Sequence, residues 1–396
     1  MKDEMDFMDL VIFPFHDYKK WIKEGFRTRD AHLFQSLKEN SKVNRIIIFN
    51  RPVSIVEATL RKGWITSKDN IIFNKKNLAI QEISPNIFVV DMLIYDLSVI
   101  WLKKLWWKKV YEHDDVIKKI TFSINYLNSY KPNILIQNPM CSPIIERVEF
   151  SSSIFDAIDN WLEHPQMNSY YDEIKKSYLV LDKNVDVITM VSKSLEKIFN
   201  RKNNIFWIPN GVDFTYFHVN ETFNDPISLG YAGKIQSRLD FKLIEKVLMS
   251  FPDVVCHFFG PVFECQNEVA KLKKTYKNAF FYGDIHYDEL PMYFDKFDIG
   301  IIPHKVNEFT ESMNPLKLYE FIRAGKPVVT TKVAGVDKVS DYVYISEDEE
   351  QFIANLNIVI SEIKLKNIST REISESLSDT YSWDEKADEI LSLFGR

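Results

Sequence analysis

Short apolar runs alternate with longer amphipathic stretches along most of this sequence. Each run is typical of a buried strand, and the stretches between runs carry apolar residues at helical spacing. This alternation predicts parallel sheets with helices on both faces. The expected strands are Asp9–Phe13, Arg45–Phe49, Asn86–Val90, Asn133–Gln137, Ser153–Ala157 and Asp186–Val191 in the first half, and Ile227–Ala232, Val254–Phe259, Ala279–Tyr282, Phe297–Ile302 and Val328–Thr331 in the second.

A turn-rich segment, 203–213, with Pro-Asn-Gly at its centre, interrupts the alternation near the middle of the chain. We therefore expect an α/β protein of two doubly wound, Rossmann-like domains, with a boundary near residue 205. In open parallel sheets, ligands bind outside the carboxyl ends of the strands, which here means a cleft that the two domains face.

One short helix has clear signals at both ends. Asn314 is a favourable N-cap, Pro315 suits the first helical position, and Gly325 is a stop signal. A helix start after a buried strand offers free N–H groups to an anion. On the polar face, Lys317 is placed to bind phosphate and Glu320 to accept hydrogen bonds from ribose hydroxyls. A capped, solvated helix would show the same pattern, so both interpretations stay open.

A second phosphate-like turn, 230–238, follows the first strand of the second half. Gly233 allows a ligand to approach the backbone closely, and Lys234 and Arg238 provide two cations four residues apart. Together with Lys317 they form three basic groups that could converge on a diphosphate. Two surface charges that open a helix remain the alternative.

The composition narrows the classes of function. The 396 residues include 50 basic and 56 acidic ones, a net charge of −6, which argues against a general nucleic-acid-binding surface. The 3 cysteines do not fall at zinc spacing. The sequence lacks a Gly-x-Gly-x-x-Gly motif, a Walker-type loop and an Asp-x-Asp pair. We therefore expect neither a cofactor nor a metal.

No apolar stretch is long enough to span a bilayer, and the N-terminus does not resemble a signal peptide. The segment Trp101–Lys109 alternates aromatic residues with lysines. It could lie in an anionic headgroup layer, or it could be a helix that buries its tryptophans. These features predict a cytoplasmic protein that can associate peripherally with the inner face of the membrane.

Three motifs together resemble the GT-B nucleotide-sugar glycosyltransferases of family 4, and in particular the branch of teichuronic-acid, capsule and exopolysaccharide enzymes. The motifs are 208–213, the turn 230–238 and the run 301–329. A weaker likeness includes 155–161 and 382–384. The resemblance implies an N-terminal acceptor domain over 1–205, a donor domain over 206–375, and a C-terminal helix over 376–396 that crosses back to the first domain.

The resemblance also implies a donor site in the second domain. Glu320 matches the family's ribose-binding glutamate, and the loop that includes Gly283 matches the segment that meets the base. The family has a second glutamate eight residues before the first, where this chain has Ser312, with Glu311 beside it. Either one could contact the donor sugar. The predicted donor-binding residues are Gly233, Lys234, Arg238, Gly283, Ile285, Ser312, Asn314, Pro315, Leu316, Lys317 and Glu320.

The acceptor side rests on polar groups in the first half. We expect His16, Arg27, Arg29 and His32 to face the acceptor, whose pyrophosphate the arginines would bind if it is lipid-linked. Surface loop charges are the alternative. Asp156 and Asp159 lie at the end of a predicted strand, where one of them could orient an acceptor hydroxyl or the departing sugar, or could serve only to cap the following helix. The predicted catalytic residues are Lys234, Arg238, Glu311, Asp156 and Asp159.

These predictions lead to a metal-independent glycosyltransferase, and the resemblance implies that it retains configuration. It would move a sugar from a UDP- or GDP-sugar to a hydroxyl of a cell-surface glycan or a polyprenyl-diphosphate-linked acceptor. In a front-face reaction the donor's own phosphate oxygen takes the acceptor proton, so no strong protein base is needed. Two alternatives remain open: a nucleotide-sugar epimerase or hydrolase of the same fold, and a catalytically silent nucleotide-binding partner of a membrane synthase.

Overall fold

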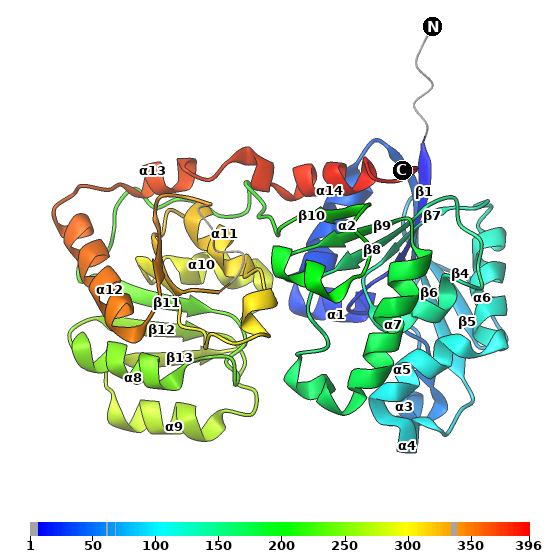
Figure 1. The fold of residues 1–396 in the computed structure, drawn as a ribbon, viewed down its shortest axis with the longest axis horizontal. Coiled ribbons are helices and arrows are strands. Elements are labelled where there is room, and N and C mark those ends of the chain that lie inside the picture. Colours follow the sequence, from blue (N-terminus) through cyan, green and yellow to red (C-terminus); the bar gives the residue numbers. More distant parts are fainter. Residues whose placement is uncertain (1–6, 61, 68, 334–338) are drawn as a thin grey trace, which may run out of the picture. The chain divides into compact units, whose positions relative to one another are not determined.

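The computed structural model describes residues 7–60, 62–67, 69–333 and 339–396. The chain forms two compact units (Figure 1). Unit 1 comprises Met1–Val191, Leu195–Ile208 and Ala387–Arg396, and unit 2 comprises Ser192–Ser194 and Pro209–Lys386.

Unit 1 is built on a sheet in the order β10-β9-β8-β7-β1-β2-β6-β5-β4, with β3 paired to β6. The strands from β10 to β6 run parallel, whereas β4 and β5 form antiparallel pairs at one edge. Residues of both parities in β1 and β2 are buried, as in a sheet covered on both faces. The strands are β1 Met8–Phe13, β2 Val43–Phe49, β3 Val53–Ser54, β4 Ile71–Lys75, β5 Leu78–Ser84, β6 Ile87–Ile94, β7 Asn133–Ile136, β8 Ser153–Ala157, β9 Val187–Met190 and β10 Ile205–Trp207.

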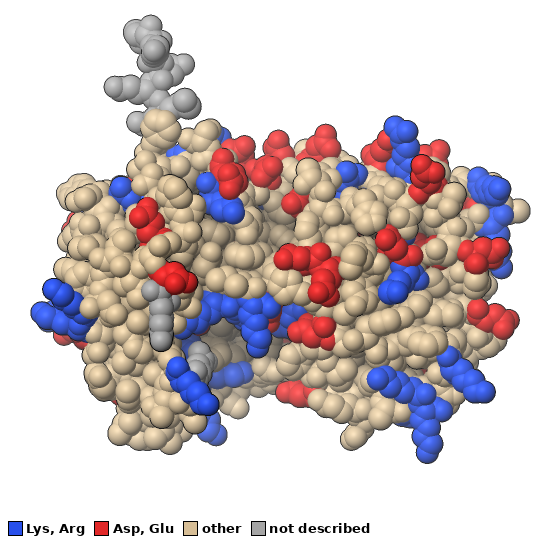
Figure 2. Space-filling view, turned by 180° about the vertical axis from the view of Figure 1, so that it is seen from behind, with Lys and Arg blue, Asp and Glu red and all other residues tan. Residues whose placement is uncertain are grey.

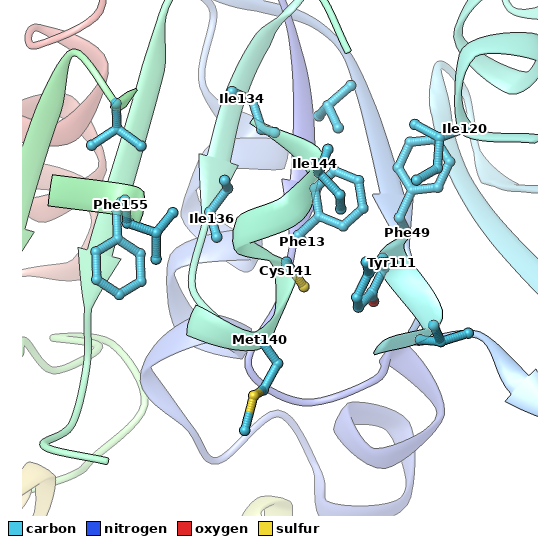
Figure 3. Packing of buried hydrophobic residues seen from close by; sticks show 14 of the residues in the cluster. Phe13, Phe49, Tyr111, Ile120, Ile134, Ile136, Met140, Cys141, Ile144 and Phe155 are labelled. Atoms are coloured by element: carbon cyan, nitrogen blue, oxygen red, sulfur yellow. The ribbon is translucent and has the colours of Figure 1, made fainter. Parts of the chain in front are cut away.

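One face of this sheet packs against the core shown in Figure 3. The rings of Phe13 and Phe49 stack with centroids 5.0 Å apart, and Tyr111 meets Phe13 edge-on at 6.2 Å. A 3-10 helix, Pro139–Ile144, adds Met140 to the same core. The helices of unit 1 are α1 Tyr18–Glu24, α2 Arg29–Glu39, α3 Ile55–Leu60, α4 Val99–Leu102, α5 Trp106–Lys109, α6 Asp114–Tyr126 and α7 Tyr171–Asn184.

Unit 2 has a parallel sheet in the order β13-β12-β11-β14-β15-β16. Because β11 lies between β12 and β14, the strand order reverses there, and the carboxyl ends of β11 and β14 form the point where such sheets bind ligands. The strands are β11 Ser228–Ala232, β12 Val255–Phe259, β13 Ala279–Gly283, β14 Ile299–Ile302, β15 Val328–Thr331 and β16 Val343–Ser346. The helices are α8 Phe241–Ser250, α9 Gln266–Thr275, α10 Leu290–Phe294, α11 Leu316–Arg323, α12 Glu349–Lys364 and α13 Thr370–Glu375. A further helix, α14 Trp383–Leu391, begins in unit 2 and ends in unit 1.

The last residues of the chain belong to unit 1. The Asp388 carboxylate accepts hydrogen bonds from Lys42 Nζ at 2.6 Å and from Asn40 Nδ2 at 3.2 Å. The backbone N–H of Gly395 donates to Ser152 Oγ at 3.0 Å. These contacts tie the end of the chain to the loop before β2 and to the start of β8.

Every strand expected from the apolar pattern is present, with ends shifted by a few residues. The helix expected from Asn314 is shorter than predicted, because it begins at Leu316 with Pro315 in the N-cap position. On the face shown in Figure 2, lysine and arginine side chains are interspersed with acidic ones, as the near balance of charges in the sequence predicts. Among the described residues, none of the helices has both the length and the apolar character to cross a bilayer.

Candidate functional site

Three glycines bring the loops at the carboxyl ends of β11, β12 and β13 together. Gly233 donates its N–H to Phe259 O at 2.8 Å, and Gly260 donates to Gly283 O at 2.7 Å. A Cβ at Gly260 would lie 2.0 Å from the Gly233 carbonyl oxygen, and both residues have positive φ, +142° and +135°. Only glycine permits this approach, so the three loops pack backbone against backbone at this edge of the sheet.

Lys317 of α11 reaches this edge. A Cβ at Gly233 would lie 3.2 Å from its Nζ, and Nζ lies 5.0 Å from the centroid of the Tyr231 ring. The side chain is buried, with 8% of its surface exposed. Burial, and then the charge of Arg238, lower the pKa of Lys317 to about 7, against the opposing effect of Glu320. An ammonium held this way gains from an anionic ligand.

Glu320 lies one turn further along the same helix and is also buried. Tyr287 Oη donates to its carboxylate at 2.9 Å. The Tyr287 ring stacks on the Tyr216 ring with centroids 4.9 Å apart. The Tyr216 hydroxyl donates a hydrogen bond to the backbone carbonyl of Tyr287. Burial raises the pKa of the Glu320 carboxyl to about 7, although the Tyr287 bond and Lys317 oppose this. A carboxylate held ready in this way can accept from hydroxyl donors of a ligand.

The raised pKa of Glu320 predicts how stability depends on pH. Between the ordinary value of 4.5 and about 7, the folded state keeps a proton that the unfolded chain has released, so the free energy of unfolding falls as pH rises. Glu320→Gln removes this contribution. In urea denaturation, the free energy of unfolding of the variant relative to wild type should rise by on the order of 2 kcal/mol between about pH 5 and about pH 7. A difference between the two proteins that does not change with pH would contradict this assignment.

Arg238 and His304 add unused polar atoms beside Lys317. Among the described residues, Arg238 Nε and both ring nitrogens of His304 are buried without a hydrogen-bond partner. The two residues are close, because the Arg238 carbonyl accepts from Lys305 N at 2.8 Å and Leu239 forms an isolated bridge with His304. Sequence reasoning missed His304. The available signal was its position directly after a predicted strand, where polar residues often face a ligand.

The segment before α11 differs from the expectation. Asn314 does not cap the helix: its Oδ1 accepts from Asn210 N at 2.7 Å, and its Nδ2 donates to Tyr319 Oη at 2.9 Å. Ser312 is fully buried and donates to Phe309 O at 2.6 Å, whereas Glu311 is exposed. Of the two candidates for a sugar contact, the glutamate is therefore the accessible one.

The other predicted donor residues vary in their surroundings. Lys234 is half-buried, with Nζ 5.7 Å from the Phe263 ring centroid. Gly283 ends β13 with φ +82°, and Ile285 beyond it is half-buried. The structure thus brings Gly233, Arg238, Lys317 and Glu320 to one edge of the unit 2 sheet and turns Ser312 into the core. Pro315 is buried and Leu316 half-buried at the start of α11.

In unit 1, two predicted site residues bind each other. Arg29 donates to Asp156 from Nε at 3.0 Å and from Nη2 at 2.9 Å, and both side chains are buried. Asp156 also accepts from Gln137 Nε2 at 3.2 Å and Thr189 Oγ1 at 2.8 Å. With four hydrogen bonds, this carboxylate has little capacity left for a hydroxyl.

The other residues predicted on the acceptor side mostly contact neighbours within unit 1. His16 donates its backbone N–H to Asp30 at 2.7 Å. Burial alone would raise the pKa of Asp30, but the charge and hydrogen bonds of His16 lower it to about 2. Arg27 pairs with Glu24 at 3.0 Å. His32 is buried in α2, and Asp159 accepts from the next residue's N–H at 2.9 Å.

A polar cavity of about 280 Å³ lies near the ends of β2 and β6, and sequence reasoning missed it. Asp17 accepts from the backbone of Arg51 at 2.9 Å, and the Arg51 guanidinium pairs with Glu57 at 2.8 Å. The guanidinium also lies 5.4 Å from the Trp107 ring centroid. Cations, carboxylates and an amide together suit a ligand with both hydroxyl and phosphate groups. The lining includes Asp17, Lys19, Asn50, Arg51, Lys62 and Asp91.

The described residues contain no group of His, Cys, Asp and Glu side chains arranged to hold a metal ion. Residues 231–362 match the family described as Glycosyl transferases group 1. The match covers Lys234, Arg238, His304, Lys317 and Glu320, so the residues gathered at this edge of the unit 2 sheet all fall inside it.

One curated relative is a protein named for teichuronic acid biosynthesis, the glycosyltransferase TuaH of Bacillus subtilis (strain 168). It is 28% identical over 241 residues, which is 56% of this chain and 60% of that protein. The alignment thus spans less than two thirds of the relative's length.

Solved structures share the fold over nearly the whole chain. Sucrose-phosphate synthase from Thermosynechococcus elongatus superposes with a TM-score of 0.68 at 11% identity, covering 98% of both chains. The trehalose-6-phosphate synthase OtsA gives 0.64 at 12% identity, covering 97% of this chain and 98% of that one. HepE of Anabaena, solved with UDP and glucose, gives a TM-score of 0.59 at 13% identity, covering 97% of this chain and 98% of that one. The GT-B fold predicted from the sequence is confirmed.

Proposed function

We propose that this chain, which carries a group 1 glycosyltransferase domain on a GT-B fold, transfers a sugar from a nucleoside diphosphate sugar to a hydroxyl of a glycan or lipid-linked acceptor. The observation that carries the proposal is the pair Lys317 and Glu320. Both are buried on one face of α11, both have a pKa near 7, and Lys317 contacts Gly233 at the point where the strand order reverses.

In this proposal the diphosphate lies against Gly233 and receives Lys317 and Arg238, and Glu320 accepts from the ribose hydroxyls. Positive groups fixed where charge develops on the departing diphosphate lower the barrier to its departure. We propose that these cations, with Lys234, serve in place of a metal. We also propose that the reaction retains configuration, with a donor phosphate oxygen accepting the acceptor's proton. We propose that the exposed Glu311, next to the position of the family's second glutamate, contacts the donor sugar.

Calorimetry with uridine, guanosine and adenosine, each as nucleoside, diphosphate and diphosphate sugar, tests the donor assignment and identifies the base. The Lys317→Met variant should lose about tenfold or more in affinity for the diphosphate, because a charge-assisted hydrogen bond disappears, and little for the nucleoside. Lys242→Met, an exposed lysine at the start of α8, is the control and should bind like wild type. Equal losses for nucleoside and diphosphate would count against a phosphate role for Lys317.

We propose that the acceptor binds to unit 1, with the polar cavity around Arg51 as the place for its polar groups. Arg29 is paired with Asp156 and Arg51 with Glu57, so the lysines that line this cavity, Lys19 and Lys62, are the cations we propose for an anionic acceptor group. A lipid-linked acceptor would also require the protein to reach a membrane surface.

The segment Trp101–Lys109 divides into a buried and an exposed part. Trp106 is fully buried and donates to Asp96 at 2.7 Å, so it cannot enter a membrane. Trp101 is 68% exposed and Ile100 is 60% exposed, and Lys103 beside them is also exposed. We propose that this exposed group inserts among headgroups of the inner face of the cell membrane.

Replacing both Ile100 and Trp101 with serine should reduce flotation with vesicles that contain phosphatidylglycerol by at least severalfold, because two apolar anchors are removed. The thermal midpoint should stay unchanged, since both side chains are exposed. Tyr130→Ser, which removes another exposed aromatic residue of unit 1, is the control. Flotation of the double variant at the wild-type level would refute the proposed membrane contact.

A further inference from the structure

His304 combines a fixed position with an unused ring. Its backbone N–H donates to Ile302 O at 3.0 Å, and its carbonyl accepts from Thr331 Oγ1 at 2.8 Å. The residue is 1% exposed, and neither ring nitrogen has a hydrogen-bond partner among the described residues. Polar groups are rarely buried this way unless they serve a purpose, because the lost hydration is not replaced.

The surroundings of the ring are positive. The His304 ring lies 6.2 Å from the Tyr231 ring, and Lys317 Nζ lies 5.0 Å from that same ring. Arg238, whose Nε is also without a partner, follows β11 close to the His304 backbone. Burial, and then the charges of Lys317 and Arg238, lower the pKa of His304 well below its ordinary value. All three effects favour the neutral imidazole.

An anion would change this balance. A diphosphate among Lys317, Arg238 and His304 offsets the two positive charges that disfavour the imidazolium and supplies oxygens that accept from a ring N–H. A neutral imidazole has one N–H donor, and an imidazolium has two. The Tyr231 hydroxyl is uncharged. Glu320 raises the pKa of Lys317 and so favours its charged form. A bound anion thus offsets the two cations that oppose proton uptake by the ring.

We propose that His304 is a direct ligand of the donor diphosphate, which it binds through a ring N–H together with Lys317 and Arg238, and that it takes up a proton from solvent as the anion binds. This inference rests on the proposed donor site and adds a residue that the resemblance to known enzymes did not supply.

The test compares His304→Phe, His304→Gln and wild type by calorimetry with uridine diphosphate, guanosine diphosphate and the two nucleosides. His304→Phe should lower affinity for the diphosphate that wild type binds about ten- to hundredfold, with nucleoside affinity unchanged. His304→Gln keeps a neutral donor, so it should lose less. In buffers of different ionisation enthalpy, both variants should take up fewer protons on binding than wild type. His218→Phe, an exposed histidine of unit 2, is the control.

A purely structural role for His304 predicts the opposite pattern. In that case His304→Phe would lower the thermal midpoint while leaving diphosphate affinity and proton uptake unchanged, or would weaken nucleoside and diphosphate equally. Either result would overturn the inference and leave the proposed donor site intact. If wild type binds neither of these diphosphates nor adenosine diphosphate, the proposed function and the inference fail together.

Discussion

Replacing Glu320 with alanine is expected to lower the affinity for a nucleoside diphosphate about a hundredfold. A carboxylate that accepts two ribose hydroxyls makes charge-assisted hydrogen bonds worth about 1.5 to 3 kcal/mol each, so losing both costs at least two powers of ten. The nucleoside alone should lose affinity by the same factor, because the lost contact is with ribose. This equal loss distinguishes Glu320 from Lys317, whose removal should affect the diphosphate alone.

Calorimetry measures both losses, with Glu350→Gln as the matched control. Glu350 is an exposed glutamate of α12 in unit 2, and its side chain pairs only at the surface with Lys246. The control should bind like wild type. Thermal unfolding should show that Glu320→Ala remains folded, since a buried carboxyl with a raised pKa stabilises the protein little near neutral pH. Unchanged affinity in a folded Glu320→Ala variant would remove Glu320 from the site.

Arg29→Met is expected to produce the largest loss of stability, about 3 to 5 kcal/mol. The substitution leaves Asp156 buried and negatively charged without its cation, and an uncompensated buried charge is far more costly than a missing ion pair. Adding Asp156→Asn should recover most of the loss. Gln137 and Thr189 donate to different oxygens of Asp156 in the wild type. The asparagine Oδ1 can still accept from Gln137 Nε2, and its Nδ2 can donate to the Thr189 hydroxyl, which is able to accept.

Urea denaturation of the single and double variants measures the recovery. Lys38→Met, which removes a partly exposed cation of the same helix, is the control and should cost little. If instead Arg29 served mainly to bind an acceptor, Arg29→Met would keep its stability and raise the concentration of acceptor needed for half-maximal transfer. A folded, fully stable Arg29→Met variant would therefore contradict the structural role.

The strands were predictable because each buried parallel strand is a continuous apolar run. The pattern missed β5, where the polar Gln81 and Glu82 interrupt the apolar residues, and β3, which has two residues. Three other missed strands lack an apolar run: β4 is half exposed, β10 is short with an exposed Trp207, and β16 is only partly buried. These three strands lie at the edges of the two sheets, where one side is open and the residues need not be apolar.

The composition of the donor site was partly visible in the sequence, because Lys317 and Glu320 lie three residues apart on a helix with clear end signals. Their burial was not visible, since it depends on Gly233 and Tyr287 from other elements. Ser312 looked like a candidate ligand by alignment with a family motif, yet its hydroxyl is used locally by Phe309. Glu311, next to it, is the accessible residue.

The unit 1 predictions depended more on tertiary contacts. Arg29 and Asp156 are 127 residues apart in the chain, and local patterns do not show that they pair. The sequence left two interpretations of the segment Trp101–Lys109 open, a membrane contact and a helix that buries its tryptophans. In the structure the chain turns at Lys103, where φ is 52°, and forms the short helices α4 and α5. Because no single helical face runs through the segment, Trp106 is buried while Trp101 is exposed.

A crystal structure with uridine diphosphate or guanosine diphosphate, whichever binds in calorimetry, tests the central claim most directly. We expect the diphosphate to lie against Gly233, with Lys317 Nζ, Arg238 and His304 within hydrogen-bond distance of its oxygens, and Glu320 to accept from the ribose hydroxyls. A nucleotide bound away from the carboxyl ends of β11 and β14, or with its diphosphate pointing away from Lys317, would contradict it.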